Sequence, residues 1–478
     1  MSSAAKSLAS ERINSLLDEN SFVEIGASVT ARSTDFNIQQ SAAASDGVVT
    51  GYGVIDGNLV YVYSQDASVL GGTIGEMHAK KILNLYDMAM KMGAPVIGLV
   101  DCAGLRLQEA TDAMNAFGEI YLKQSLASGV IPQITAVLGQ AGGGLAIATQ
   151  LSDFTFVESS KGKLFVNAPN ALAGNSAEKC DTASAAWQAE KAGTVDFAGT
   201  EDEIFAAIRE LVTMIPSNNE DDASYDECND DLNRLVEDID AAAGDAALVL
   251  SQIADDNAFF ETKKDFAKNV VTGFLRLNGQ TVGAVANRTE VYDAEGKKVE
   301  EFESALCPNA CAKAAKFVNF CDAFDIPVLT LTNVTGFKAT EHAEFKIARA
   351  AAKLTYAFAN ANVPKVNVVI GKAFGSAANV MNSKGTGADL VFAWTDAQIS
   401  TMDAKLAAQI MFDGADNETL NEKAAEYATL QSSAQAAARR GYVDAIIDPA
   451  DTRKQLIGAF EMLYTKREDR PVKKHGTV

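Results

Sequence analysis

Three consecutive glycines in the first half of the chain have the type and spacing to stabilise negative charge. Gly142, Gly143 and Gly144 follow an apolar run at 134–138 that predicts a buried strand, and they open a small-residue segment that predicts a helix start. Glycine lets the backbone approach a ligand closely, and N–H groups in the first turn of a helix lack intrahelical partners. A carbonyl oxygen that becomes an enolate would be stabilised there, by roughly 10²–10³ in rate per donor. A single GGG has a second explanation, which is close packing of the helix on the strand.

The glycine pattern occurs a second time, in GKAFGSA at 371–377 after another apolar run at 366–370. Five matching pairs are each 232 positions apart: Pro95 with Pro327, Gly104 with Gly336, Pro132 with Pro364, Gly139 with Gly371, and Gly143 with Gly375. Upstream, VVTGYGVIDG at 48–57 and VVTGFLRLNG at 270–279 are 222 apart, so the second copy holds about ten extra residues near 292–303. The sequence therefore predicts an internal duplication of about 220 residues, with two facing sites that stabilise an electrophile.

Strand and helix signals alternate along the chain. The expected helices cover 4–19, 76–92, about 111–128 and 451–465, and the expected strands include 48–53, 59–63 and 96–100. This alternation predicts an α/β fold with largely parallel sheets and right-handed crossovers. Residues 218–231 hold seven acidic residues in fourteen positions, which is typical of an exposed linker. We therefore expect two tandem homologous domains, 1–225 and 226–478.

Composition excludes several classes of protein. The formal net charge of −22 over 478 residues argues against a nucleic-acid partner. Six cysteines without a CxxC pair predict neither a disulfide framework nor a metal site, and Cys307 and Cys311 are interpreted as ordinary thiols. The N-terminus has no apolar core typical of a signal peptide. The uncharged stretch 124–152 has the length of a membrane span, but its proline, glutamines and glycines favour a buried strand–turn–helix. We expect a soluble, cytoplasmic protein.

Many collinear motifs resemble one family over nearly the whole chain. They include GGTIGEMHAKKI at 71–82, LASGVIPQI at 126–134, VPKVNVVIGKAFGSA at 363–377 and NVMNSKGTGADLVFAW at 379–394. The sequence resembles the carboxyltransferase β subunits of biotin-dependent acyl-CoA carboxylases, and equally the α subunits of biotin-dependent acyl-CoA decarboxylases. The resemblance implies a ClpP/crotonase-type fold in each half. It also implies an obligate homodimer, usually within a hexamer, whose active sites lie between the first half of one subunit and the second half of another.

The resemblance implies a mechanism that uses both glycine turns. Carboxybiotin on a separate carrier protein releases CO2, the resulting biotin enolate takes a proton next to the acyl-CoA thioester, and the acyl-CoA enolate captures CO2. Gly143 and Gly144 would hold the thioester oxygen on the acyl-CoA side, which is the first domain. Gly375, Ser376 and Ala377 would hold the ureido oxygen on the biotin side, which is the second. No metal is predicted, and decarboxylation is the same path reversed.

Further residues are candidates for substrate binding by the same resemblance. Gly104 and Gly142 would line the acyl-CoA site, and Asn379 would lie near the acyl group or only cap and pack. The cations Arg106, Lys80 and Lys81 would contact CoA phosphate or pantetheine, or be surface charges. The chain departs from the family at four places, which put the acyl-chain specificity in doubt: Leu105 replaces a small residue, Ser376 a glycine, Asn333 an aspartate, and 173–180 a TGE-containing segment.

Four functions remain open at the level of sequence. The first is a carboxylase component acting on propionyl-CoA/methylmalonyl-CoA or acetyl-CoA/malonyl-CoA, with a biotin carboxylase subunit as partner. The second is the α subunit of a sodium-pumping decarboxylase, peripheral to a membrane subunit. A crotonase-type hydratase or isomerase is disfavoured because Ile147 and Asn379, eight positions after Gly139 and Gly371, are not proton-transfer groups. A non-catalytic scaffold is disfavoured by the intact glycines at 142–144.

Overall fold

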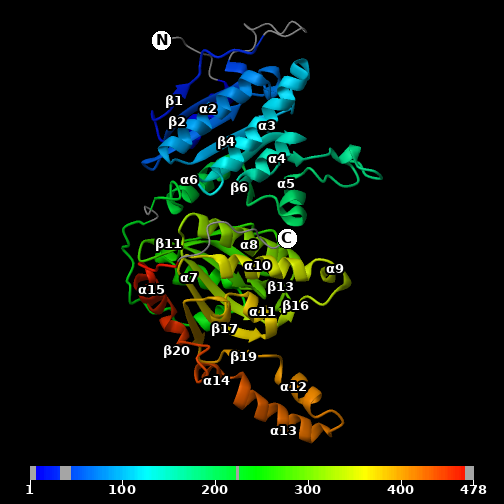
Figure 1. Ribbon diagram of the computed structural model, residues 1–478, viewed down its shortest axis with the longest axis vertical. Helices are drawn as coiled ribbons and strands as arrows, with labels where there is room; N and C mark the ends of the chain where they lie inside the picture. The colour runs from blue at the N-terminus through cyan, green and yellow to red at the C-terminus, as the bar shows by residue number, and fades with distance from the viewer. Residues whose placement is uncertain (1–6, 33–44, 222–224, 469–478) are drawn as a thin grey trace. The chain divides into compact units, whose positions relative to one another are not determined.

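The computed structural model describes residues 7–32, 45–221 and 225–468, and the chain divides into two compact units, 1–224 and 225–478 (Figure 1). We call these the first unit and the second unit. The acidic stretch 218–231 spans the division, and its residues 222–224 lie outside the described part, as do residues 4–6 of the expected N-terminal helix. The described part of that helix is α1, Leu8–Leu16.

The first unit is built on one sheet of eight strands. Its strands are β1 (Val23–Ile25), β2 (Val48–Ile55), β3 (Asn58–Gln65), β4 (Val96–Cys102), β5 (Gln133–Gly142), β6 (Phe154–Glu158), β7 (Lys163–Phe165) and β8 (Phe197–Gly199). Their order is β1-β2-β3-β4-β5-β6-β8, with β7 also on β5. The pairs β1–β2 and β2–β3 are antiparallel, and every pair from β3 onward is parallel. The predicted parallel α/β architecture is confirmed.

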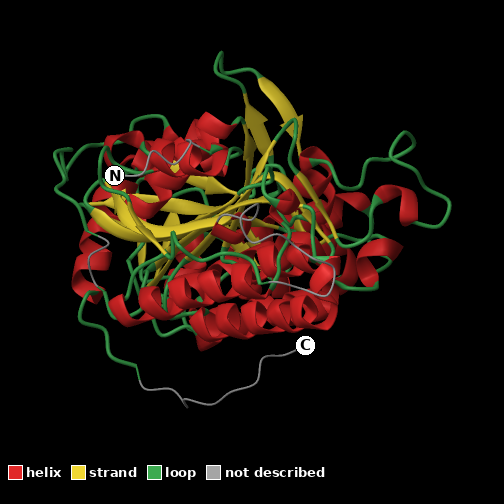
Figure 2. Ribbon diagram, turned by 90° about the horizontal axis from the view of Figure 1, so that it is seen from above, coloured by secondary structure: helices red, strands yellow, loops and turns green. Residues whose placement is uncertain are grey.

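Several helices of the first unit, α1, α2, α4 and α6 among them, pack against this sheet (Figures 1 and 2). Besides α1, the helices of this unit are α2 (Glu76–Met92), α3 (Ala110–Ala127), α4 (Gly144–Leu151), α5 (Ala185–Trp187) and α6 (Glu201–Met214). Helix α2 has the bounds that the sequence predicts, because Ile82, Leu85 and Ala89 form a buried stripe at helical spacing and Gly93 ends the helix in the left-handed conformation at φ 62°. It packs with α3, while α1 packs with α6.

The second unit repeats the same sheet. Its strands are β9 (Phe259–Thr262), β10 (Val270–Leu277), β11 (Gln280–Asn287), β15 (Val328–Val334), β17 (Lys365–Phe374), β18 (Leu390–Trp394), β19 (Gln398–Ser400) and β20 (Ala445–Ile447). Their order is β20-β18-β17-β15-β11-β10-β9, with β19 on β17. Strand β4 maps on β15 with a shift of 232 residues (328 − 96), and β2 maps on β10 with a shift of 222 (270 − 48). The predicted duplication is thus present in the fold.

The helices of the second unit are α7 (Ala246–Ile253), α8 (Pro308–Ala323), α9 (Glu341–Glu344), α10 (Ile347–Asn360), α11 (Gly375–Val380), α12 (Ala404–Met411), α13 (Asn417–Tyr427), α14 (Ala434–Ala438) and α15 (Thr452–Leu463). Helix α15 corresponds to the helix expected at 451–465. The part of the basic tail at 469–478 lies outside the described residues. Helix α8 packs with α10 as α2 does with α3.

The extra residues of the second copy form a hairpin. Strands β12 (Glu290–Tyr292) and β13 (Lys298–Glu301) pair antiparallel, between β11 and α8. Two short strands follow, β14 (Ala305–Leu306) and β16 (Gly336–Phe337), which pair in parallel. The equivalent pairing in the first unit is the bridge between Ile74 and Leu105. The hairpin is therefore an addition that leaves the repeated frame unchanged.

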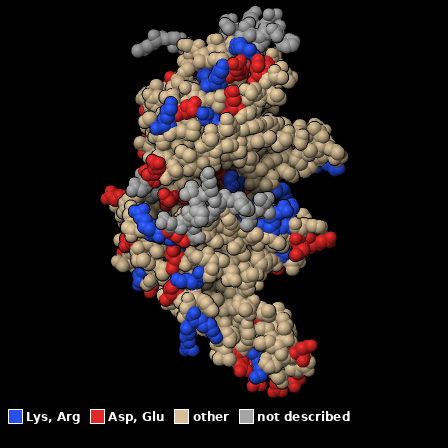
Figure 3. All heavy atoms as spheres, viewed as in Figure 1, with Lys and Arg blue, Asp and Glu red and all other residues tan. Residues whose placement is uncertain are grey.

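The surface is mixed in charge. Figure 3 shows basic and acidic side chains interspersed on the face in view. Within the described ranges, none of the helices combines the length and apolarity needed to cross a bilayer. The described residues also contain no cluster of three His, Cys, Asp or Glu side chains arranged to hold a metal ion.

Candidate active site

The first glycine turn, residues 139–144, joins β5 to α4. Strand β5 runs on through Gly142, four residues beyond the expected apolar run, and α4 begins at Gly144. Between them Gly143 has φ 61° and ψ −126°, a conformation that side-chain-bearing residues rarely adopt. A Cβ on Gly142 would lie 2.8 Å from the ring of Phe165, and one on Gly144 would lie 2.7 Å from the hydroxyl of Tyr121. Packing therefore requires glycine at positions 142 and 144, and the backbone conformation requires glycine at position 143.

The backbone donors of this turn are not equivalent. The N–H of Gly143 donates to the carbonyl of Phe165 at 2.9 Å, because β7 pairs with the end of β5. The N–H of Gly144 is the first of α4 and has no acceptor within that helix. The Gly144 carbonyl accepts from the Tyr121 hydroxyl at 2.7 Å. Both glycines were predicted to hold an oxyanion. The bond to Phe165 favours Gly143 as the residue that shapes the turn, and the contact of both glycines with an oxyanion stays a prediction.

A second donor lies in the loop after β4, which sequence reasoning missed. Cys102 at the end of β4 pairs with Ala141, so this loop and the first glycine turn meet at the same edge of the sheet. In the bridge with Ile74, the bonds use the carbonyl of Gly104 and the N–H of Arg106. The N–H of Leu105 therefore points away from the bridge, and within the described part of the chain it has no acceptor. The signal that the sequence offered for Leu105 was its position directly after Gly104, which has φ 108° in the structure.

The second glycine turn, residues 371–377, repeats the backbone of the first. Strand β17 ends at Phe374 and α11 begins at Gly375, which has φ 59° as Gly143 has 61°. Strand β19 pairs with the end of β17 in the register that β7 has on β5, so Phe374 lies opposite Ser400 as Gly142 lies opposite Phe165. The N–H groups of Gly375, Ser376 and Ala377 belong to the first turn of α11, where the helix itself supplies no acceptor. The replacement of glycine by Ser376 leaves its N–H in place. Three adjacent donors at the carboxyl edge of a parallel sheet can bind one anionic oxygen.

A pocket of about 530 Å³ adjoins the second turn and brings together Gly375, Ser376 and Asn379. Ala377 is buried and is not part of its lining. The Asn379 side-chain oxygen accepts from Ser383 at 3.3 Å. The far wall comes from Tyr427, Gln431, Arg440 and Tyr442. Sequence reasoning missed these four because they follow the turn by about fifty residues or more and belong to no motif that the sequence displays.

The cation Lys81 lies in the protein interior. Its ammonium donates to the carbonyls of Ser45 and Val48, and burial lowers its pKa to about 8. Lys313, its equivalent in the second unit (313 − 81 = 232), donates to the carbonyls of Lys263, Phe266 and Val270 at 2.8–3.0 Å. The same cage in both units favours a structural role for Lys81 over the predicted contact with CoA. Lys80 is exposed and pairs with Glu76 at 2.7 Å, so its contact with CoA stays a prediction.

Arg106 is likewise enclosed, with 1% of its side chain exposed. Its guanidinium donates to the carboxylates of Asp46 at 2.5 Å and Glu109 at 2.9 Å, and to the carbonyl of Thr73 at 2.6 Å. Burial raises the pKa of Asp46, and the Arg106 charge opposes that rise. The neighbouring His78 donates its N–H to Asp46 at 2.7 Å, and burial lowers the pKa of its ring to about 3. This cluster fixes the loop after β4 and favours a structural role for Arg106.

Asn333 keeps the contact that its acidic counterpart makes. In the first unit, a Cβ on Gly139 would overlap the carboxylate of Asp101, which accepts from the N–H of Gln140 at 3.4 Å. In the second unit, a Cβ on Gly371 would lie 2.6 Å from the Asn333 side-chain oxygen, which accepts from Lys372 N–H at 3.1 Å. The departure from aspartate therefore changes the charge beside the second turn and leaves its geometry in place.

One α/β frame that occurs twice, with a glycine turn at the carboxyl edge of each parallel sheet, defines a protein of duplicated crotonase-type fold. The carboxyl transferase domain matches residues 2–478, and the chain belongs to that family of enzymes. It is 39% identical to the methylmalonyl-CoA decarboxylase subunit alpha of Propionigenium modestum, over 99% of this chain and 93% of the relative. It is also 39% identical to the propionyl-CoA carboxylase beta chain of Roseobacter denitrificans, over 99% and 94%.

A solved structure extends the comparison to three dimensions. The transcarboxylase 12S crystal structure, whose hexamer assembly was determined with hydrolysed methylmalonyl-CoA bound, has a TM-score of 0.91 with this chain. The identity is 36%, over 98% of this chain and 92% of that chain. The predicted fold and family are confirmed.

Proposed function

We propose that this chain is the carboxyltransferase subunit that moves a carboxyl group between carrier-bound carboxybiotin and the α-carbon of a short acyl-CoA. The acyl pair is propionyl-CoA/methylmalonyl-CoA or acetyl-CoA/malonyl-CoA. The observation that carries the proposal is the presence of two equivalent glycine turns, each of which opens a helix whose first N–H groups have no acceptor within the helix. Carboxyl transfer between two such partners needs two sites that stabilise an oxyanion, whereas a hydration needs one and a proton-transfer group beside it.

The first unit is assigned to acyl-CoA. The N–H groups of Gly144 and Leu105 hold the thioester oxygen and stabilise the charge that it gains when the α-carbon loses a proton. Gly143 and Gly142 keep the turn in its conformation, and Gly104 leaves space for the thioester because nothing lies within 4 Å of where its Cβ would stand. Lys80 is the exposed cation of this unit that we assign to a CoA phosphate. The domain boundary that we propose is 1–225 and 226–478.

The second unit is assigned to the biotin ureido ring. The pocket of about 530 Å³ suits a flat bicyclic ring, because the donors of the second turn lie beside apolar walls from Val369, Ala373 and Ala378. Biotin, when bound there, supplies the carboxyl group as CO2. Gly375, Ser376 and Ala377 orient the ureido oxygen and stabilise its negative charge, and Asn379 with its partner Ser383 forms the polar end of the pocket.

The partners follow from this assignment. A chain of this kind needs a biotin carrier protein and a second copy of itself, in a homodimer or a hexamer. A carboxylase would add a biotin carboxylase subunit, and a sodium-pumping decarboxylase would add a membrane subunit. The resemblance to the methylmalonyl-CoA decarboxylase alpha subunit supports the second as strongly as the propionyl-CoA carboxylase beta chain supports the first.

Decarboxylation of malonyl-CoA and methylmalonyl-CoA by the purified chain, with and without free biotin, tests the proposal. Biotin-dependent loss of the carboxylate supports it, and the faster substrate names the acyl group. Hydration of crotonyl-CoA is the control, since Ile147 and Asn379 occupy the positions where a hydratase needs a glutamate. Rapid hydration without decarboxylation would overturn the proposal in favour of a hydratase.

A further inference from the structure

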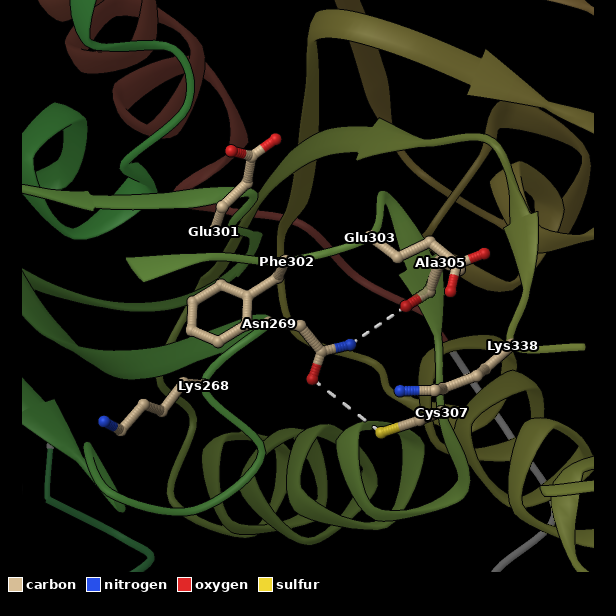
Figure 4. A pocket seen from close by; sticks show the side chains of 8 residues that line it. All are labelled: Lys268, Asn269, Glu301, Phe302, Glu303, Ala305, Cys307 and Lys338. Atoms are coloured by element: carbon tan, nitrogen blue, oxygen red, sulfur yellow. Dashed lines mark hydrogen bonds between the residues drawn. The ribbon is translucent and has the colours of Figure 1, made fainter. Parts of the chain in front are cut away.

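The second unit contains a smaller pocket that the proposed function leaves unused. Its volume is about 290 Å³. Residues of the extra hairpin and the segment after it lie on one side, and the start of α8 lies on the other (Figure 4). We call it the hairpin pocket, and its lining is Lys268, Asn269, Glu301, Phe302, Glu303, Ala305, Cys307 and Lys338. The inference drawn from it does not depend on carboxyl transfer.

The first unit shows what the repeated frame holds at the same place. Lys338 is the equivalent of Arg106 (338 − 106 = 232), and Lys268 is the equivalent of Asp46 (268 − 46 = 222). In the first unit, Asp46 and Glu109 place two carboxylates on Arg106. Glu109 also accepts from the N–H of Glu76, the first residue of α2, at 2.6 Å. This part of the frame therefore carries a cation with carboxylates bound to it.

The second unit keeps a cation but not the carboxylates bound to it. Lys268 stands in place of Asp46, and the equivalent of Glu109 is Glu341, an exposed residue at the start of α9. Among the described residues, Lys338 has no carboxylate within ion-pair distance. Lys268 is satisfied by Glu300 at 2.6 Å. The second unit thus presents a cation at the position where the first unit has a closed ion cluster.

Polar side chains of the hairpin pocket lie near the Lys338 ammonium. Figure 4 shows the Lys338 ammonium pointing toward Asn269 and Cys307. The Asn269 amide donates to the Ala305 carbonyl at 2.9 Å, and the Cys307 thiol donates to the Asn269 side-chain oxygen at 3.7 Å. Of the two lining carboxylates, Glu301 pairs with Lys298 at 2.8 Å and points away from the other polar groups, and Glu303 is exposed. Lys338 is exposed as well, so the pocket presents to solvent an ammonium group that forms no ion pair with any described carboxylate.

We propose that the hairpin pocket binds the carboxylate or phosphate group of a small metabolite, with Lys338 as the principal cation. The bound oxyanion takes the place that Glu109 and Asp46 fill in the first unit. The hairpin residues enclose the pocket on one side and therefore limit the size of the metabolite. The first unit has no insertion at the equivalent place. Lys338 directly follows β16, which packs against α11 of the second glycine turn. An anion in the pocket therefore lies one short strand away from that turn.

Selective alkylation of Cys307 in the full-length protein tests the proposal at the site itself. The thiol lines the pocket, so anionic iodoacetate should react with it faster, relative to neutral iodoacetamide, than it does with the exposed Cys180. Peptide mass spectrometry gives both ratios in one sample. We expect the ratio at Cys307 to exceed that at Cys180 about threefold, the effect of one near-surface charge pair. Inorganic phosphate at constant ionic strength should slow alkylation of Cys307 and leave Cys180 unaffected.

Two variants and a matched control localise the effect. Lys338→Met should reduce the ratio at Cys307 to that at Cys180 and remove the protection by phosphate. Lys268→Asp should do the same, because it restores the carboxylate that the first unit has beside Arg106. Lys353→Met removes an exposed lysine of α10 and should change neither. Equal ratios at the two cysteines in the unaltered protein, or phosphate protection that persists in Lys338→Met, would overturn the proposal. Repeating the competition with acetate and with CoA separates carboxylates from phosphate esters.

Discussion

The two glycine turns share a backbone conformation and differ in the residues that surround them. In the first turn, β7 uses the Gly143 N–H through Phe165, so Gly144 and the neighbouring Leu105 remain. In the second turn, β19 pairs with β17 as β7 pairs with β5, and a pocket of about 530 Å³ adjoins Gly375 and Ser376. The difference teaches that duplication conserved the turn conformation and its strand pairing, while the wall residues set what each copy can bind.

The largest expected effect comes from the conformation of the first turn. Gly143→Ala puts a side chain on a residue at φ 61°, ψ −126°, so the turn must rearrange and the Gly144 donor moves. We expect a loss of about 10² in kcat/KM for carboxyl transfer, the effect of one misplaced oxyanion donor. Gly414→Ala is the matched control, because Gly414 also has positive φ and open space at its Cβ but lies far from both turns in sequence. An active Gly143→Ala variant would remove the first turn from the mechanism.

The next effect concerns the Tyr121 hydroxyl, which forms a hydrogen bond to the backbone of the first turn. Tyr121 donates to the Gly144 carbonyl at 2.7 Å, and burial raises its pKa, so the hydroxyl stays protonated. Tyr121→Phe leaves that carbonyl without its partner at a cost of about 1 kcal/mol, and we expect kcat to fall about fivefold with little change in KM. Steady-state kinetics on acyl-CoA make the measurement. A change in KM alone would mean that Tyr121 serves binding and not the position of the donor.

As the pH falls, the first unit should lose stability at a higher pH than the second unit. His78 is neutral in the fold because its pKa is lowered to about 3, whereas an unfolded histidine titrates near 6.5. Between these values the unfolded state binds one more proton, so the first unit loses about 1.4 kcal/mol for each pH unit below about 6. The equivalent position in the second unit is Ala310, which cannot titrate.

Hydrogen exchange of peptides from the two units, followed from pH 7 to 5 with correction for the intrinsic rate, measures this difference. Protection in the first unit should fall more steeply, and His78→Gln should reduce its slope by about one proton. Equal slopes in the two units would show that His78 does not govern the loss of stability between pH 7 and 5.

The frame could be predicted from the sequence, and the pairing of individual donors could not. Helix α2 could be predicted because the spacing of its apolar residues is a local pattern. The shift of 232 residues could be predicted because the matching prolines and glycines lie in short similar segments. The bond from Gly143 to Phe165 depends on β7, which begins about twenty residues later in the chain. No sequence motif marks Phe165 as the acceptor. Arg106 likewise looked free, because Asp46, which neutralises it, lies sixty positions earlier in the chain. Contacts of that kind become visible only when the sheet brings them together.

The smallest expected effect tests whether Asn333 is a change of charge alone. Asn333→Asp keeps an oxygen for the Lys372 N–H, as Asp101 does for Gln140, so we expect the free energy of unfolding to change by less than about 0.5 kcal/mol. Asn333→Ala removes the acceptor and should cost about 1–2 kcal/mol, since the N–H is left without its partner. Urea unfolding of both variants, monitored by a probe in the second unit, compares them directly. Equal destabilisation by aspartate and alanine would mean that the second turn cannot accommodate the carboxylate that the first turn holds, and that the two copies have diverged in electrostatics as well as in wall residues.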